Sequence, residues 1–162
     1  MRDYASKILD RASMKAERQR LREQGRTVAF TNGCFDLLHA GHVDLLAFSR
    51  EQGDVLVVGM NSDASVRRIK GEDRPVLPQD DRARLLAALE AVDYVVIFEE
   101  DRVDDLVAEV LPDVLVKGAD WQHDVHGREI VEQNGGRIVI APLTQGRSSS
   151  RILGKILERG TR

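Results

Sequence analysis

Short apolar runs alternate along the chain with longer segments that carry apolar residues at helical spacing. Five of the runs are typical of strands, at about residues 26–31, 55–59, 94–98, 113–117 and 137–141. Helical patterns follow them at about 41–52, 66–69, 79–91, 101–110, 127–134 and 148–157. Continuous apolar runs are typical of parallel strands that are covered on both faces. The pattern therefore predicts an α/β fold in a single domain, a Rossmann-like open parallel five-stranded sheet with helices on both faces.

A further helix is predicted ahead of the first strand, over about residues 3–24, with Gly25 ending it. Its apolar stripe is thin, so we expect it to pack against the domain edge or a partner subunit rather than form the core. We accordingly divide the chain into an N-terminal helical extension, residues 1–25, and a main domain, residues 26–162.

Composition places the chain among soluble globular proteins. It has 162 residues, of which 42% are hydrophobic and 31% charged, which suits one domain with one core. No apolar run approaches 18 residues and no apolar export signal opens the chain, so we expect neither a membrane span nor secretion. The single cysteine, Cys34, cannot form an internal disulfide, which favours a cytoplasmic location.

The charge balance argues against nucleic acid as a partner. The net charge is −3, whereas general nucleic-acid binders are usually basic. One basic cluster, residues 15–22, is interrupted by Glu17 and followed by Glu23. It is typical of a solvated helix face with charge pairs one turn apart.

The richest chemistry lies in residues 28–46, VAFTNGCFDLLHAGHVDLL. A strand, a glycine turn and a helix start follow one another there, which directs backbone N–H groups and a helix dipole at one spot. His39 and His42 are three residues apart and so neighbours on one helical turn. The dinucleotide-binding G-x-G-x-x-G pattern is absent, and incidental helix-capping histidines are the alternative. The arrangement favours a receptor for phosphate charge.

Further polar motifs come directly after other predicted strands. Asn61-Ser62-Asp63 follows the second strand, and Gly118-Ala119-Asp120-Trp121 follows the fourth. Ligands of open parallel sheets bind beyond the carboxyl ends of the strands, at a topological switch point. The motifs therefore predict one shared active site at that edge.

The segment Gly33-Cys34-Phe35-Asp36 followed by His39-Ala40-Gly41-His42 resembles the GxFD…HxGH signature of the nucleotidylyltransferase superfamily that includes the cytidylyltransferases. Nearly the whole chain is similar to one branch, the adenylyltransferases acting on D-glycero-β-D-manno-heptose 1-phosphate. The resemblance rests on Asn61-Ser62-Asp63, Lys70-Gly71…Arg74-Pro75, Arg82, Val92-Asp93, residues 116–121, Gly135-Gly136 and residues 146–150.

The resemblance implies transfer of AMP from ATP to the heptose phosphate, with release of pyrophosphate, for lipopolysaccharide or other surface-glycan precursors. It implies ATP as substrate, Mg²⁺ carried with the triphosphate, no protein metal site and a homodimer. The catalytic residues would be His39, His42 and Lys70. The nucleotide-binding residues would be Asn32, Gly33, Cys34, Phe35, His39, Gly41, His42, Lys117, Gly118, Asp120, Ser148, Ser149 and Ser150. The substrate-binding residues would be Asp36, Asn61, Asp63, Arg74, Arg82 and Trp121.

Several of these residues have ordinary alternatives. Lys70 and Arg74 also fit a solvated surface loop, and the serine run also fits a simple helix cap. Cys34 fits a small buried packing residue better than a reactive thiol, because no catalytic base motif accompanies it. His123 and His126 form an H-x-x-H pair without a third metal ligand, which favours a loop near the acceptor pocket.

Departures from the glycerol-3-phosphate cytidylyltransferases bear on the substrate. Where these enzymes have arginines, this chain has Glu90 and, after Pro142, Leu143. Arg147 precedes the serine run, where the branch usually has isoleucine or cysteine, and its role is unassigned. A cytidylyltransferase acting on an alcohol phosphate stays the first alternative, and a non-catalytic nucleotide-binding regulatory domain the second.

Overall fold

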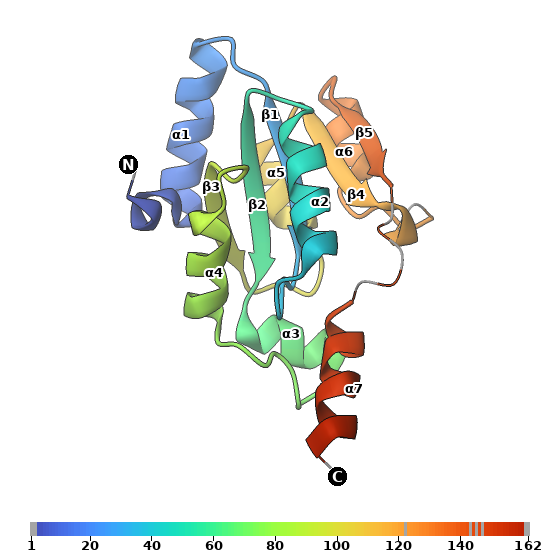
Figure 1. Cartoon of the computed structure of the whole chain (residues 1–162). Coiled ribbons are helices and arrows are strands. Elements are labelled where there is room, and N and C mark those ends of the chain that lie inside the picture. The colour runs from blue at the N-terminus through green and yellow to red at the C-terminus, as the bar shows by residue number, and fades with distance from the viewer. Residues whose placement is uncertain (1–2, 122, 143, 145, 147, 161–162) are drawn as a thin grey trace.

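Five parallel strands form the centre of the part of the chain that the structure, a computed structural model, describes: residues 3–121, 123–142, 144, 146 and 148–160. The strands are β1 (Val28–Gly33), β2 (Val55–Asn61), β3 (Tyr94–Phe98), β4 (Val114–Gly118) and β5 (Arg137–Ala141). Their order in the sheet is β3-β2-β1-β4-β5 (Figure 1). The predicted open parallel sheet is confirmed.

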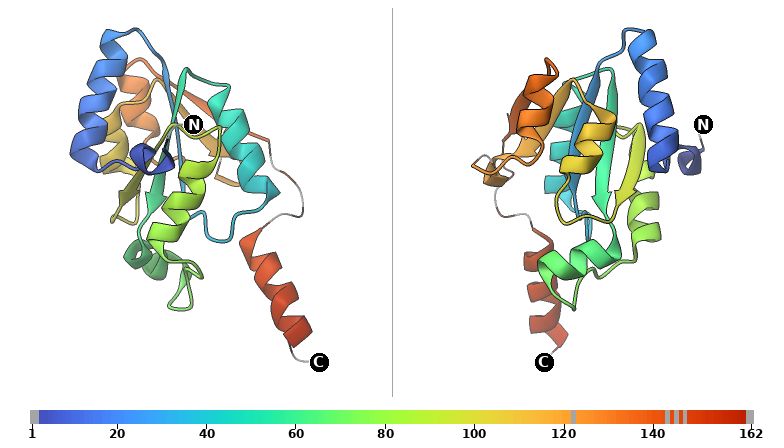
Figure 2. Two further views of the ribbon diagram at one scale, coloured as in Figure 1. Left: turned by 60° about the vertical axis from the view of Figure 1, so that its left-hand side comes forward. Right: turned by 180° about the vertical axis from the view of Figure 1, so that it is seen from behind.

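Helices cover both faces of the sheet, as predicted (Figures 1 and 2). The helices are α1 (Arg11–Glu23), α2 (Ala40–Arg50), α3 (Asp63–Lys70), α4 (Gln79–Ala88), α5 (Asp104–Val110), α6 (Arg128–Gln133) and α7 (Ser149–Gly160), with 3-10 turns η1 (Tyr4–Lys7) and η2 (Ala119–Trp121). Helices α1, α5 and α6 share one core cluster, and α2 and α4 contribute to the other.

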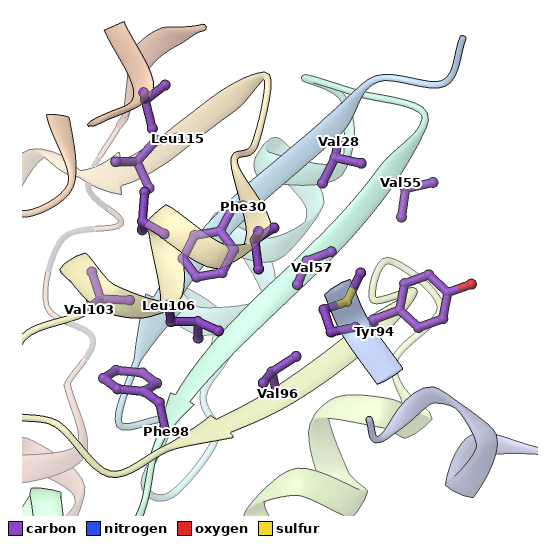
Figure 3. Packing of buried hydrophobic residues seen from close by; sticks show 14 of the residues in the cluster. Val28, Phe30, Val55, Val57, Tyr94, Val96, Phe98, Val103, Leu106 and Leu115 are labelled. Atoms are coloured by element: carbon purple, nitrogen blue, oxygen red, sulfur yellow. The ribbon is translucent and has the colours of Figure 1, made fainter. Parts of the chain in front are cut away.

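Alternating side chains of the strands fill these two clusters. Val28 and Phe30 of β1 point to one face, and Ala29 between them points to the other. Figure 3 shows the first cluster, in which the Leu106 side chain is seen between the rings of Phe30 and Phe98. Burial on both faces explains why the strands are continuous apolar runs in the sequence.

Strands β1 and β2 extend further than their apolar runs predict. The pairing of β1 with β2 runs from Val28 with Val55 to Gly33 with Met60, and β2 pairs with β3 as far as Asn61 with Phe98. The residues beyond both apolar runs therefore keep the sheet pairing. In contrast, β1 and β4 pair only through Ala29 with Val114 and Phe30 with Leu115. The sheet therefore loses its hydrogen-bond ladder between β1 and β4 just before the predicted site residues.

The N-terminal segment is not one continuous helix, which corrects the prediction. An extended stretch at Ile8 and Leu9 separates η1 from α1 and lies beside the edge strand β3. Ile8 forms a bridge with Val95, and the Leu9 N–H donates to the Val95 carbonyl at 2.9 Å. The chain is extended there because the edge of β3 offers unpaired backbone groups. Gly25 does end α1, with a left-handed φ of +67°.

Helix α1 belongs to the core, so the expectation that it packs outside the core was wrong. Met14 and Leu21 have no exposed surface and lie in the same cluster as β1. The guanidinium of Arg18 is also buried and donates to the Leu111 carbonyl at 2.8 Å and to Asp113 at 3.1 Å. The division of the chain at residue 25 stays a prediction.

Helices α3 and α7 lie at the end of the molecule toward which the strands run, and α7 extends away from the body (Figure 1). No residue of α7 is buried, and Ile156 and Leu157 are 59% and 65% exposed. Among the residues described, no helix combines the length and the apolar character that crossing a membrane would require.

Replacing Met14 by alanine should lower the free energy of unfolding by about 2–5 kcal/mol, because it opens a cavity under α1. Gln19→Ala, on the exposed face of the same helix, is the matched control and should change stability by less than about 0.5 kcal/mol. Urea unfolding of both variants measures the difference. Equal stability of the two would show that α1 contributes little to the core.

Candidate active site

The turn from β1 into α2 brings the two predicted histidines together. His39 is the residue that precedes α2, and His42 lies in its first turn. Their rings are stacked, with centroids 3.8 Å apart and planes at 23°. The Phe35 ring lies against His42, with centroids 5.3 Å apart. Both imidazoles therefore lie at the N-terminus of α2, where the helix dipole favours negative charge.

Two residues of this turn have left-handed backbone conformations although neither is glycine. Phe35 has a φ of 48° and Leu37 a φ of 53°. Such conformations are costly for side chains with a Cβ, and they persist where the surrounding structure holds them. The Phe35 side chain is buried in the second core cluster, which is one restraint on the turn.

Asp36, between these two residues, holds a second segment against the turn. Its buried carboxylate accepts from the backbone N–H groups of Val76 and Leu77 at 2.9 and 3.1 Å. The Arg74 guanidinium lies 3.2 Å from the same carboxylate. The segment that follows α3 is thus fixed directly beside the histidine turn.

Arg82 joins three backbone segments from a fully buried position in α4. Its guanidinium donates to the carbonyls of Cys34 at 2.6 Å, Asn61 at 2.9 Å and Leu77 at 3.0 Å. Its remaining partner is the Asp63 carboxylate, at 2.6 Å. In this conformation Arg82 shapes the site from beneath, because a side chain without exposed surface contacts no ligand.

The other predicted residues at the end of β2 are also engaged within the chain. The Asn61 amide donates to the Ser65 hydroxyl at 2.9 Å, and the Cys34 thiol lies 3.9 Å from the Asn61 Oδ1. Cys34 is half-buried rather than buried, and burial raises the pKa of its thiol. A thiol that stays protonated is a poor nucleophile, in agreement with the packing interpretation.

Lys70 and Arg74 differ in their surroundings. Lys70 is the exposed last residue of α3, and its charge acts on the Cys34 thiol. Arg74 is held by Asp36, as described above. Lys70 is thus an exposed cation near the histidine turn, whereas Arg74 contacts Asp36 and supports the turn.

The end of β4 reaches the same region. The buried ammonium of Lys117 donates to the side-chain Oδ1 of Asn32, which lies at the end of β1. The next residue, Gly118, leaves room for Asp120, whose Oδ1 would lie 2.6 Å from a Cβ at that position. Any larger residue at Gly118 would displace the Asp120 carboxylate.

The serine run begins α7, as predicted. Ser148 precedes the helix, and its hydroxyl accepts from the Arg151 N–H at 3.2 Å, which is the contact of a helix cap. The Ser149 hydroxyl donates to the backbone carbonyl of Asp36. Ser150 is exposed in the first turn. Through Ser149, the start of α7 is attached to the histidine turn.

Burial makes His42 a neutral imidazole. Desolvation first, and the neighbouring His39 second, lower its pKa to about 4, against an opposing effect of Asp36. Its Nδ1 is buried and makes no hydrogen bond within the described residues. A neutral imidazole has one donor and one acceptor nitrogen, so the His42 ring can donate to or accept from a bound group.

His126 and His123 lie in the loop before α6, away from the histidine pair in sequence. His126 contacts two carboxylates, with Nε2 3.4 Å from Asp124 and Nδ1 4.0 Å from Asp104. Within the described ranges, no group of three or more potential metal-ligating side chains comes together. The Trp121 side chain, for which a substrate-binding role is predicted, lies outside the described part of the structure, as do Arg147, whose role is unassigned, and Leu143.

The structure thus gathers the histidine turn, Asn61-Ser62-Asp63, the segment 74–77, Lys117 and the start of α7 at one edge of the sheet. Sequence reasoning missed the N–H groups of Val76 and Leu77, which hold Asp36, because backbone groups leave no signal in side-chain identity. It also missed that Asn32 and Lys117 bond to each other.

Comparisons with known proteins agree with this architecture. The family model described as "Cytidylyltransferase-like" matches residues 30–154. A crystal structure of a lipopolysaccharide core biosynthesis protein from Thermoplasma volcanium is similar, with a TM-score of 0.61 and 27% identity over 76% of this chain and all of that one. A pantoate-beta-alanine ligase from Francisella tularensis shares the fold, with a TM-score of 0.60, 18% identity and coverage of 88% of this chain and 68% of the ligase.

Curated relatives match over almost the full chain. The bifunctional protein HldE of Syntrophotalea carbinolica is 49% identical over 97% of this chain and 32% of the relative. That of Geobacter sulfurreducens is 54% identical over 83% of this chain and 28% of the relative. The chain spans about a third of the length of these relatives. With the family model matched over most of its length and the histidine turn in place, the chain belongs to the cytidylyltransferase-like family.

Proposed function

We propose that this chain is a nucleotidyltransferase that joins AMP from ATP to D-glycero-β-D-manno-heptose 1-phosphate and releases pyrophosphate. The product would serve lipopolysaccharide or other surface-glycan synthesis in the cytoplasm. The stacked His39–His42 pair at the N-terminus of α2 is the observation that carries the proposal. The similarity to bifunctional HldE proteins supports the heptose branch.

In this reaction a phosphate oxygen of the sugar attacks the α-phosphate of ATP, a new P–O bond forms, and the bond to pyrophosphate breaks. The protein aligns the groups and stabilises charge on the phosphoryl oxygens. His39, His42 and the backbone N–H groups of the 32–35 turn would donate to those oxygens. Because the attacking oxygen is already an anion, no separate nucleophile of the protein is required.

The surrounding cations would complete the phosphate site. Lys70 is exposed and has the reach of a flexible lysine, so it would contact the reacting phosphates. Ser148 and Ser150, at the start of α7, would add hydroxyl donors. The Asp36 oxygens accept from Val76 and Leu77, and Arg74 lies beside them, so we propose that Mg²⁺ enters with the triphosphate rather than on this carboxylate.

Two further parts of the proposal concern assembly and the alternative substrate. We propose a homodimer, for which the exposed Ile156 and Leu157 of α7 offer apolar surface. The family description keeps a cytidylyltransferase as the second candidate, while Glu90, exposed after α4, stands where the glycerol-3-phosphate enzymes have an arginine. Whether the chain uses ATP or CTP distinguishes the adenylyltransferase from the cytidylyltransferase directly.

Pyrophosphate release should occur with D-glycero-β-D-manno-heptose 1-phosphate, magnesium and ATP, and fall at least about tenfold with CTP or GTP. A coupled phosphate assay with each nucleotide in turn measures this. Release with CTP alone would assign the chain to the cytidylyltransferases. ATP binding without release for any sugar phosphate would favour a non-catalytic nucleotide-binding domain.

Replacing either His39 or His42 by alanine should lower kcat by about 10²–10³-fold, because the phosphoryl oxygens lose a preorganised hydrogen-bond donor. The fold should survive, since both side chains are only partly buried. Val43→Ala, on the exposed side of α2, is the control and should keep normal turnover. Near-normal turnover of either histidine variant would remove that residue from the mechanism.

The unfolding free energy should fall as the pH is lowered from about 6.5 toward 4, in part through His42. Its folded pKa of about 4 lies below the usual 6.5, so the unfolded chain binds the extra proton in this window. Its contribution is therefore fully present above pH 6.5 and is lost as the pH falls. Urea unfolding at pH 5 and 7.5 should show a smaller pH effect for His42→Gln than for the wild type. An equal effect in both proteins would contradict the lowered pKa of His42 in the folded chain.

A further inference from the structure

Two polar side chains meet where the sheet stops being continuous. Strands β1 and β4 pair only as far as Phe30 and Leu115, yet each continues for a few residues. Asn32 and Lys117 lie on these continuations, which still pair with β2 and β5 but no longer with each other, and the Lys117 ammonium donates to the Asn32 Oδ1. The neighbouring strands leave β1 and β4 in opposite directions, so this is the topological switch point of the sheet.

The two side chains differ in their access to solvent. Lys117 is 7% exposed, whereas Asn32 is half-buried. The carboxylates that act on the ammonium are Asp104 of α5, Asp120 of η2 and Asp124 of the following loop. Among the described residues none of them is within ion-pair distance, so Asn32 is the hydrogen-bond partner that the structure gives to Lys117. Lys117 is thus nearly closed to solvent, and the half-buried Asn32 is the member with the greater access for a ligand.

The bond determines which end of the Asn32 amide is available. A lysine ammonium has three donors and no acceptor, so it bonds to Oδ1 and not to Nδ2. The amide is thereby oriented with its NH2 group left for another partner. A group that can only donate suits a ligand rich in acceptor oxygens, such as a nucleoside triphosphate.

We propose that Lys117 is a positioning residue, which locks the Asn32 amide so that its NH2 group donates to an oxygen of the bound nucleotide. The inference rests on the proposed function, because it takes ATP as the ligand of this edge. It differs from a direct role of Lys117, in which the ammonium itself would contact the nucleotide.

Nucleotide affinity measured by calorimetry with Mg-ATP and no sugar phosphate tests the role. Lys117→Met should weaken ATP binding about 10- to 100-fold, because the amide is free to turn its oxygen toward the phosphates. At saturating ATP, kcat should fall by a smaller factor than the ATP affinity does, since the histidine pair is intact. Lys15→Met, the same change on the exposed face of α1, should leave ATP affinity unchanged.

Asn32→Asp provides an independent variant at the half-buried position. The carboxylate still pairs with Lys117, but it has no N–H for the ligand, so ATP binding should be lost at least as strongly. In the double variant Asn32→Ala, Lys117→Met, ATP should bind no more weakly than to Asn32→Ala alone, because Lys117 acts through Asn32. A further loss in the double variant, equal to the loss in Lys117→Met, would overturn the positioning role.

The pH dependence of ATP affinity is a further test, because a merely structural role of Lys117 would not affect it. Burial lowers the pKa of Lys117 to about 8, against the raising effect of Asp104, Asp124 and Asp120. Wild-type ATP affinity should therefore fall as the pH rises through about 8, while Lys117→Arg, which keeps its charge, should show no such fall.

Failure of the inference and failure of the proposed function give different results. In one case the wild type binds ATP and releases pyrophosphate, while Lys117→Met or Asn32→Asp binds ATP with normal affinity. That result would overturn this inference alone. A wild type that binds no ATP would overturn the proposed function, and the inference with it.

Discussion

A buried guanidinium holds together the edge of the sheet on which the site is built. Arg82 has no exposed surface and donates to carbonyls of three segments that are far apart in the chain. A buried charge costs several kcal/mol unless its hydrogen bonds are satisfied, and here the Asp63 carboxylate and the three carbonyls satisfy them. The ends of β1 and β2 and the segment before α4 are therefore held at one geometry. The histidine turn follows directly on the end of β1, so its position depends on these contacts of Arg82.

Asp36 extends the same framework to the remaining parts of the site. Its carboxylate binds the segment 74–77, and its carbonyl accepts from Ser149 at the start of α7. The left-handed residues on either side of it, Phe35 and Leu37, show that the turn is held against its local preference. In this conformation Asp36, Arg74 and Arg82, which the motif pattern associates with the substrate, thus contact other parts of the chain. The partly buried His39 and His42 and the exposed Lys70, Ser148 and Ser150 keep surface on which a triphosphate could bind.

The N-terminal segment shows how a weak pattern can hide a structural role. Its apolar residues are few, but Met14 and Leu21 complete one face of the core, and Ile8 covers the edge of β3. Arg18 reaches the C-terminal end of α5 with an ion pair to Asp113, whose carboxylate also accepts from the Val28 N–H. A short stripe is enough when the helix lies flat on a sheet, because the strands supply most of the buried surface.

By itself, the sequence determined the strand and helix pattern from the first strand onward, the parallel sheet, the family and the location of the histidine turn. These follow from periodicity and local motif, which depend on residues close together in the chain. Only the tertiary structure decided that Asn32 bonds to Lys117, that Arg82 is fully buried, and that α1 joins the core. Each of these joins segments distant in sequence, and several use backbone carbonyls and N–H groups that every residue type carries. Such contacts exist only once the strands have been placed side by side, so no spacing of residues along the chain could reveal them.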